Sequence, residues 1–133
     1  MNTLSYHSSL DNGFLAFELF VDGVAFGEIL GNGYKGIPYW NIENDLPHCP
    51  PHGASRNLDF RIVTVCSCGE YGCGHSRCRV IKTAETVTFC DFTGDVSTNS
   101  TNHVFVFSHP DYQCIVNGII AEARHQKQKY HEK

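Results

Sequence analysis

Four of the seven cysteines in the chain lie within fourteen residues, between Val65 and Cys78. Cys66 and Cys68 are two positions apart, so on an extended backbone their side chains leave the same face. The glycines that follow allow the chain to fold back tightly, because glycine adopts backbone angles that other residues avoid. We therefore expect a thiol-rich knuckle in which the later thiol and imidazole groups come round toward the first pair. Its ligand candidates are Cys66, Cys68, Cys73, His75 and Cys78.

One use of such a cluster is to hold a metal ion. A structural zinc site takes about four Cys, His or carboxylate ligands in a tetrahedral arrangement. The stretch could supply all of them, and His48, Cys49 and His52 are an alternative source for the last one. The spacing is Cys-x-Cys, whereas structural sites usually pair their cysteines as Cys-x-x-Cys. One structural zinc and a reduced, partly buried thiol cluster both stay open, and thiol–disulfide exchange is a weaker third alternative.

The residues from Cys66 to Cys73 also carry a resemblance. Their order, Cys-Ser-Cys-Gly-Glu-Tyr-Gly-Cys, resembles the Cys-x-Cys-Gly-x-x-Gly-Cys signature of a family of small bacterial single-domain proteins. In those proteins the signature ends a strand, and a strand similar to Val87–Phe92 and a terminal helix follow it. The resemblance covers roughly residues 58–123 and leaves His75 and Cys78 outside the shared signature. It implies a fold and no particular activity.

Length and composition limit the class of protein. A chain of 133 residues fits one domain, residues 1–133, and its 41% hydrophobic and 18% charged residues are typical of an ordinary globular protein. The longest apolar runs are four to six residues, too short for a membrane span. The start of the chain lacks the basic and apolar regions of a secretory signal. We therefore expect a cytoplasmic protein, and an odd number of cysteines fits a reducing compartment.

The charge distribution indicates what kind of partner the chain could bind. Residues 1–65 contain seven acidic and three basic side chains, whereas residues 66–133 contain seven of each. The basic groups of the second part gather in a tail, residues 124–133. An acidic body argues against broad nucleic-acid binding and suits a basic protein partner. The contact candidates are Glu18, Glu28, Tyr34, Tyr39, Trp40, Glu43 and Asp45.

The elements that must position these residues start with strands. Residues 3–10 and 14–21 are predicted strands, and the second places Leu15, Phe17 and Leu19 on one face. Asp22-Gly23 then predicts a hairpin turn into a further strand over residues 24–30. Loops that we expect to be mobile follow near residues 31–57 and 93–102.

The second half of the chain predicts three more strands and a helix. The strands cover residues 58–66, 86–92 and 103–107. The helix begins after Ser108, a suitable N-cap, and carries an apolar stripe from Tyr112 to Ala123. The predicted fold class is therefore α+β: a single antiparallel β-sheet with the C-terminal α-helix packed on one face.

The search for catalytic motifs favours a binding protein over an enzyme. The chain has no Gly-x-Ser-x-Gly elbow, no phosphate-binding Gly-Lys-Ser/Thr loop and no His-Glu-x-x-His motif. Bacterial immunity proteins share its general profile, a small acidic domain with long loops. We predict a non-catalytic protein-binding domain that neutralises a cognate toxin domain by covering its active surface. The alternative is a small zinc-binding protein, or a zinc- or thiol-dependent enzyme that uses the Cys66–Cys78 cluster.

Overall fold

The computed structural model describes residues 1–11, 14–34, 36–39, 60–65, 74–97 and 102–131. These residues form strands and helices in the order β1 (Leu4–Asp11), β2 (Phe14–Val21), β3 (Val24–Ala25), α1 (Phe26–Ile29), β4 (Ile37–Pro38), β5 (Phe60–Val65), β6 (His75–Lys82), β7 (Thr86–Gly94), β8 (Phe105–Ser108) and α3 (His109–His131).

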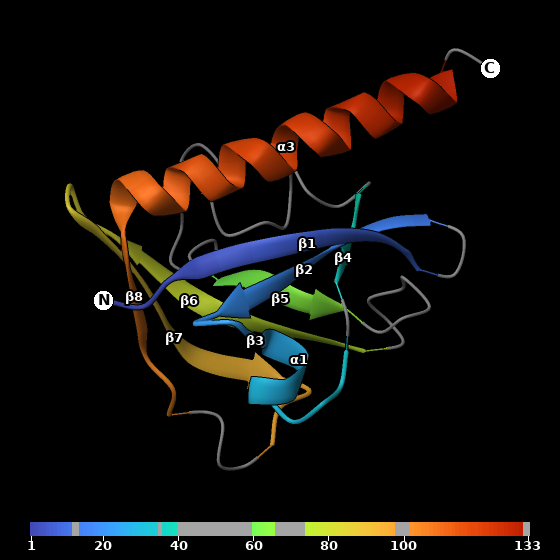
Figure 1. Ribbon diagram of the computed structural model, residues 1–133. Coiled ribbons are helices and arrows are strands. Elements are labelled where there is room, and N and C mark those ends of the chain that lie inside the picture. The colour runs from blue at the N-terminus through green and yellow to red at the C-terminus, as the bar shows by residue number, and fades with distance from the viewer. Residues whose placement is uncertain (12–13, 35, 40–59, 66–73, 98–101, 132–133) are drawn as a thin grey trace.

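The strands belong to two antiparallel sheets. In the first sheet β1 pairs with β2, and both β3 and β4 pair with the other edge of β2. The second sheet has the order β5-β6-β7-β8. Figure 1 shows the first sheet in front of the second, with α3 lying across the top of both. The α+β class is confirmed, but the predicted single sheet is two sheets, because the short strand β4 contacts β5 without forming a hydrogen-bonded ladder with it.

The strand β2 has the predicted bounds and the predicted faces. Phe17, Leu19 and Val21 are buried in the core, and the residues between them face the other side of the sheet. The turn that follows is a tight hairpin turn, since Asp22 and Gly23 both have positive φ angles, 52° and 83°. This conformation matches the twist of paired strands, and the hairpin turn predicted from Asp22-Gly23 is therefore confirmed.

The second arm of this hairpin differs from the prediction. Only Val24 and Ala25 pair with β2, and the chain then turns into the short helix α1. Phe26 and Leu30 are fully buried, and in a helix residues four apart lie on the same side. The ring of Phe26 packs against Phe89 of the second sheet, with ring centroids 6.1 Å apart. Burial against the second sheet therefore overrides the strand propensity of this run.

The strands of the second sheet begin and end near the residues that the sequence pattern predicts, but not at those residues. β5 lies within the predicted strand, but a register shift between Ile62 and Thr64 breaks its simple alternation. β6 begins at His75, so the last part of the predicted knuckle is a strand. β7 extends to Gly94, two residues beyond the predicted end.

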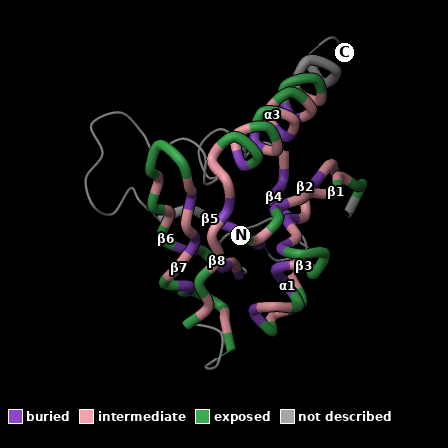
Figure 2. Tube along the Cα trace, turned by 60° about the vertical axis from the view of Figure 1, so that its left-hand side comes forward, coloured by how far each residue is buried: buried purple, intermediate pink, exposed green. Residues whose placement is uncertain are grey.

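One hydrophobic core joins the two sheets and α3. Phe89 lies at its centre, with ring contacts to Phe107 at 4.9 Å and to Tyr112 of α3 at 5.9 Å. Figure 2 shows buried and exposed residues alternating along the strands, as expected for sheets with one covered face. The apolar stripe predicted for α3 is the side that packs against this core, including Val116 and Ile119.

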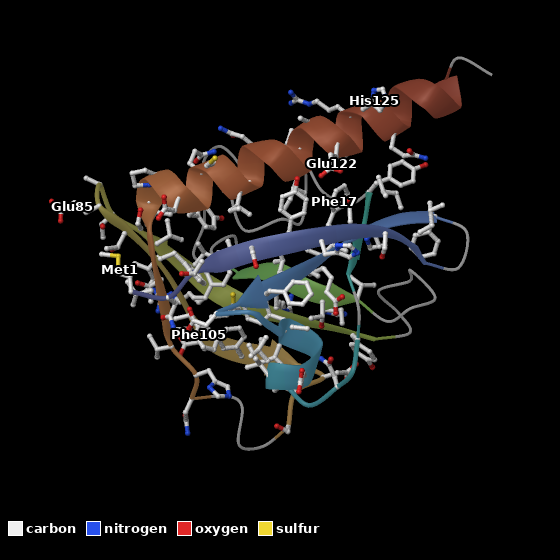
Figure 3. The ribbon with its side chains drawn as sticks, in the orientation of Figure 1. Met1, Phe17, Glu85, Phe105, Glu122 and His125 are labelled. Carbon is white, nitrogen blue, oxygen red and sulfur yellow. The ribbon has the colours of Figure 1, made fainter. Side chains whose placement is uncertain are left out.

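Hydrogen bonds fix both the start and the middle of α3. Ser108 caps the helix, because its hydroxyl accepts a hydrogen bond of 3.3 Å from the amide of Asp111. Further along, Glu122 lies on the side of α3 that faces β1 (Figure 3) and accepts hydrogen bonds from the hydroxyls of Tyr6 and Ser8. The helix continues through most of the predicted basic tail, as far as His131. Among the described helices, none has the length and apolarity to cross a membrane.

Candidate functional site

A hollow opens where the first sheet is incomplete. Along one edge of β2, Phe20 and Val21 pair with β3, whereas Ala16 and Phe17 pair with β4. Glu18 lies between these two short ladders. Beside it is a hollow of about 430 Å³, lined by Glu18, Ala25, Gly27, Glu28, Gly31, Gly33 and Tyr34. The chain segment that leaves β3 and returns as β4 forms the rest of the wall.

Glu18 faces the hollow because of its place in the β2 pattern. Its neighbours Phe17 and Leu19 face the core, so Glu18 points to the opposite side of the sheet. It is half-buried there, and His7 is its partner in the register with β1. The carboxylate is thus held on a rigid strand at the rim of the opening.

Glu28 comes to the same hollow from α1. Burial of Phe26 and Leu30 fixes the orientation of this short helix, which leaves Glu28 exposed on its other side. Gly27 allows the following loop to close onto the helix, because a Cβ at this position would overlap the carbonyl oxygen of Tyr34. A hydrogen bond of 2.9 Å from the amide of Gly33 to the carbonyl of Gly27 closes the loop.

Tyr34 forms the aromatic wall of the hollow. The side-chain oxygen of Asn32 accepts a hydrogen bond of 2.8 Å from the amide of Tyr34, which fixes the backbone of the loop. The phenol hydroxyl of Tyr34 donates to the carboxylate of Asp95 at 2.9 Å. Among the residues that the structure describes, two carboxylates and one phenol ring line the hollow, and no basic group does.

The structure brings together three of the predicted contact residues, namely Glu18, Glu28 and Tyr34. Tyr39 follows β4 and packs partly against the hydrophobic core, and it is not among the residues that line the hollow. The other three candidates, Trp40, Glu43 and Asp45, lie outside the described residues. The sequence analysis named these three residues as contact candidates, which stays a prediction, and nothing in their spacing indicated that they share one hollow.

The predicted metal ligands are placed only in part. Cys66, Cys68, Cys73, His48, Cys49 and His52 lie outside the described residues. Cys78 is completely buried in the core, and this burial raises the pKa of its thiol well above the ordinary value, with smaller contributions from Cys90 and Asp91.

His75 and Cys78 do not come together as the knuckle prediction expects. Both belong to β6 and are three positions apart, so their side chains leave opposite faces of the strand. A single ion between them would need one of the two faces to turn over. In the part of the chain that the structure describes, no three His, Cys, Asp or Glu side chains form a group that could hold a metal ion.

A buried polar group beside the hollow was not predicted. Thr64 and Ser76 are fully buried and hydrogen-bonded to each other across β5 and β6. The amide nitrogen of Asn32 donates to the Thr64 hydroxyl at 3.3 Å and to the main-chain oxygen of Asp95 at 2.7 Å. The one sequence signal was a threonine inside the otherwise apolar end of a strand. Asp95 gave no signal, because it stands in a polar segment that resembles an ordinary loop.

Comparisons with known proteins give no further assignment. No family model, no curated protein and no solved structure matches the chain. The strand β7 and the helix α3 lie where the resemblance to the cysteine-signature family implies a strand and a terminal helix. These two elements occur in that order in many folds, so membership of that family stays a prediction.

Proposed function

We propose that this chain is a non-catalytic binding domain of the immunity type, which neutralises a toxin domain by covering its active surface. The observation that carries the proposal is the hollow of about 430 Å³ into which β2, α1 and the following loop bring Glu18, Glu28 and Tyr34. We expect a lysine or arginine side chain of the toxin domain to enter this hollow.

The chemistry of the hollow suits such a group. Carboxylates form charge-assisted hydrogen bonds with ammonium and guanidinium groups, and the face of a tyrosine ring attracts a cation. Residues 1–65 have four more acidic than basic side chains, so the field around the hollow also attracts a basic surface from a distance. A toxin that acts on nucleic acid needs a basic cleft, and this attraction would accelerate its association with the chain.

The test is affinity capture from an extract of the native host at low ionic strength. We expect the wild-type chain to retain one protein that inhibits growth or cleaves nucleic acid, and an equimolar amount of the chain to abolish that activity. The double variant Glu18→Gln/Glu28→Gln should lose the retained protein. A matched control is Glu85→Gln, which removes one exposed carboxylate from the β6–β7 turn, far from the hollow in the chain.

Two results would overturn the proposal. The first is that no protein is retained even at low ionic strength. The second is that the retained protein has no toxic activity, or that the double variant retains it as well as the wild type does. Either result would favour the alternative functions based on the cysteine cluster.

A further inference from the structure

The orientation of Tyr34 depends on a residue that does not line the hollow. Tyr34 stands in a loop without regular secondary structure, so its own backbone leaves the ring several orientations. Its hydroxyl donates to Asp95 Oδ2 at 2.9 Å, and Asp95 follows directly after β7 in the second sheet. This hydrogen bond therefore connects the wall of the hollow to the opposite sheet.

Asp95 is itself fixed at three points. Its amide donates to the carbonyl of His75 at 2.9 Å, which holds it at the start of β6. Its main-chain oxygen accepts a hydrogen bond from Asn32 at 2.7 Å, and its carboxylate accepts the hydrogen bond from Tyr34. Asn32 and Tyr34, two residues apart in the loop, thus hold the main chain and the side chain of one residue.

Gly74 makes room for this arrangement. It is buried, and a Cβ at this position would overlap the hydroxyl of Tyr34 and lie 2.7 Å from Asp95 Oδ2. The phenol and the carboxylate therefore meet over a backbone without a side chain. The contact is as close as it is because position 74 is glycine.

We infer that Asp95 is a positioning residue for the hollow: it holds the ring of Tyr34 in the orientation that receives a cationic side chain, and it does not touch that side chain itself. The inference rests on the proposed function for its ligand, a lysine or arginine group. Its structural content, that Asp95 orients Tyr34, is independent of that function. The two parts therefore need separate measurements.

The binding measurement uses a hexa-arginine peptide as the probe, titrated calorimetrically into the full chain at physiological ionic strength. We expect Asp95→Ala to weaken binding about five- to tenfold, the effect of losing about one hydrogen bond. Asp95→Asn keeps an acceptor oxygen for the Tyr34 hydroxyl, so it should retain the wild-type affinity within about twofold. Asp91→Asn is the charge control, since Asp91 is an exposed carboxylate of β7 four residues before Asp95.

A double-mutant cycle separates positioning from a general loss of structure. Tyr34→Phe removes the hydroxyl and should reproduce the effect of Asp95→Ala, and the double variant Asp95→Ala/Tyr34→Phe should bind no more weakly than either single variant. Additive losses, or equal losses in Asp95→Asn and Asp95→Ala, would overturn the inference. A merely structural role of Asp95 would not be rescued by asparagine in this way.

The second measurement needs no ligand. In the proton–nitrogen NMR spectrum of the free chain, Asp95→Ala should shift the amides of Gly31, Gly33 and Tyr34, whereas Asp95→Asn should leave them close to the wild type. If these shifts occur and the wild-type chain binds no peptide, the proposed function fails and the positioning stands. If Asp95→Ala leaves the three amides unchanged, the positioning fails whatever the peptide does.

Discussion

Within the described residues, the two sheets of this protein have the same number of strands and differ in continuity. In the second sheet β6 and β7 pair along most of their length, and their neighbours β5 and β8 extend the ladder on both sides. In the first sheet β2 has an eight-residue partner on one edge and two short partners of two residues each on the other. Glu18, which lines the hollow, lies on β2 between the residues that pair with those short partners.

If the hollow binds a partner as proposed, this difference assigns stability to one sheet and recognition to the other. The continuous sheet contributes Phe89, Phe92 and Phe107 to the core, whereas the interrupted sheet places Glu18 between two short ladders, where it lines the hollow. The hydrogen bonds of Asp95, which follows β7, connect the continuous sheet to Asn32 and Tyr34 in the loop before β4.

The largest expected effect comes from the centre of the continuous sheet. Phe89→Ala removes a fully buried ring that contacts Phe26, Phe107 and Tyr112, so we expect a loss of about 3–5 kcal/mol in the free energy of unfolding. Urea unfolding measures it. The control is Ile81→Ala in the same sheet, where the side chain is 42% exposed and the expected change is below about 0.5 kcal/mol. Similar losses in both variants would contradict the stabilising role given to this sheet.

A smaller loss of stability is expected beside the first sheet, where Gly27 of α1 contacts the loop that lines the hollow. Gly27→Ala places a Cβ against the carbonyl of Tyr34, and such overpacking typically costs about 1–3 kcal/mol. We also expect the amides of Gly31 and Gly33 to shift, because the loop must move to relieve the overlap. The control is Glu28→Gln, which keeps nearly the same side-chain volume on the same helix. It should leave both the free energy of unfolding and the amide chemical shifts of Gly31 and Gly33 unchanged. A fully tolerated alanine would show that the loop does not close onto α1.

The hydrogen bond between Tyr6 of the first sheet and Glu122 of α3 predicts that the free energy of unfolding depends on pH. Burial, and then the hydrogen bond and charge of Glu122, raise the pKa of Tyr6 from 10.0 to about 12. A raised pKa in the folded state means that this contribution to stability is complete below pH 10.0 and is lost as the pH rises toward about 12.

At neutral pH, Tyr6→Phe should lower the free energy of unfolding by about 1 kcal/mol. As the pH rises from 10.0 toward about 12, the free energies of unfolding of the wild type and of Tyr6→Phe should therefore converge. The control is Ser8→Ala, which removes the other hydrogen bond to Glu122 and leaves the tyrosine in place. The difference in the free energy of unfolding between Ser8→Ala and the wild type should therefore stay constant over this pH range. A constant difference between Tyr6→Phe and the wild type up to pH 12 would contradict the shift.

The smallest effect is expected on the outer face of the continuous sheet. Arg79 and Asp91 lie 3.9 Å apart, and their side chains are 46% and 63% exposed. Exposed ion pairs contribute about 0–1 kcal/mol, so Arg79→Ala should change the midpoint of urea unfolding very little. A loss comparable to that of Gly27→Ala would show that this face is covered by something else in solution.

Local patterns were sufficient for much of the fold. The alternation over 14–21, the Asp-Gly turn and the capped helix after Ser108 each depend on neighbours in the chain, and the structure confirms each of them. The predicted strand over 24–30 is confirmed at Val24 and Ala25 and wrong from Phe26 onward, where the chain forms α1 and Phe26 packs against a ring of the second sheet. A strand and a short helix place the same apolar residues differently, and only the distant surface decides between them.

The sequence by itself determined the residue types of the candidate site: acidic groups in its first half, a tyrosine among them, and a separate cysteine cluster. Only the tertiary structure decided that Glu18, Glu28 and Tyr34 meet in one hollow, and that His75 and Cys78 leave opposite faces of one strand. The physical reason is range. Side-chain periodicity is set by the backbone within a few residues, whereas a site requires segments that come together through the burial of a shared core.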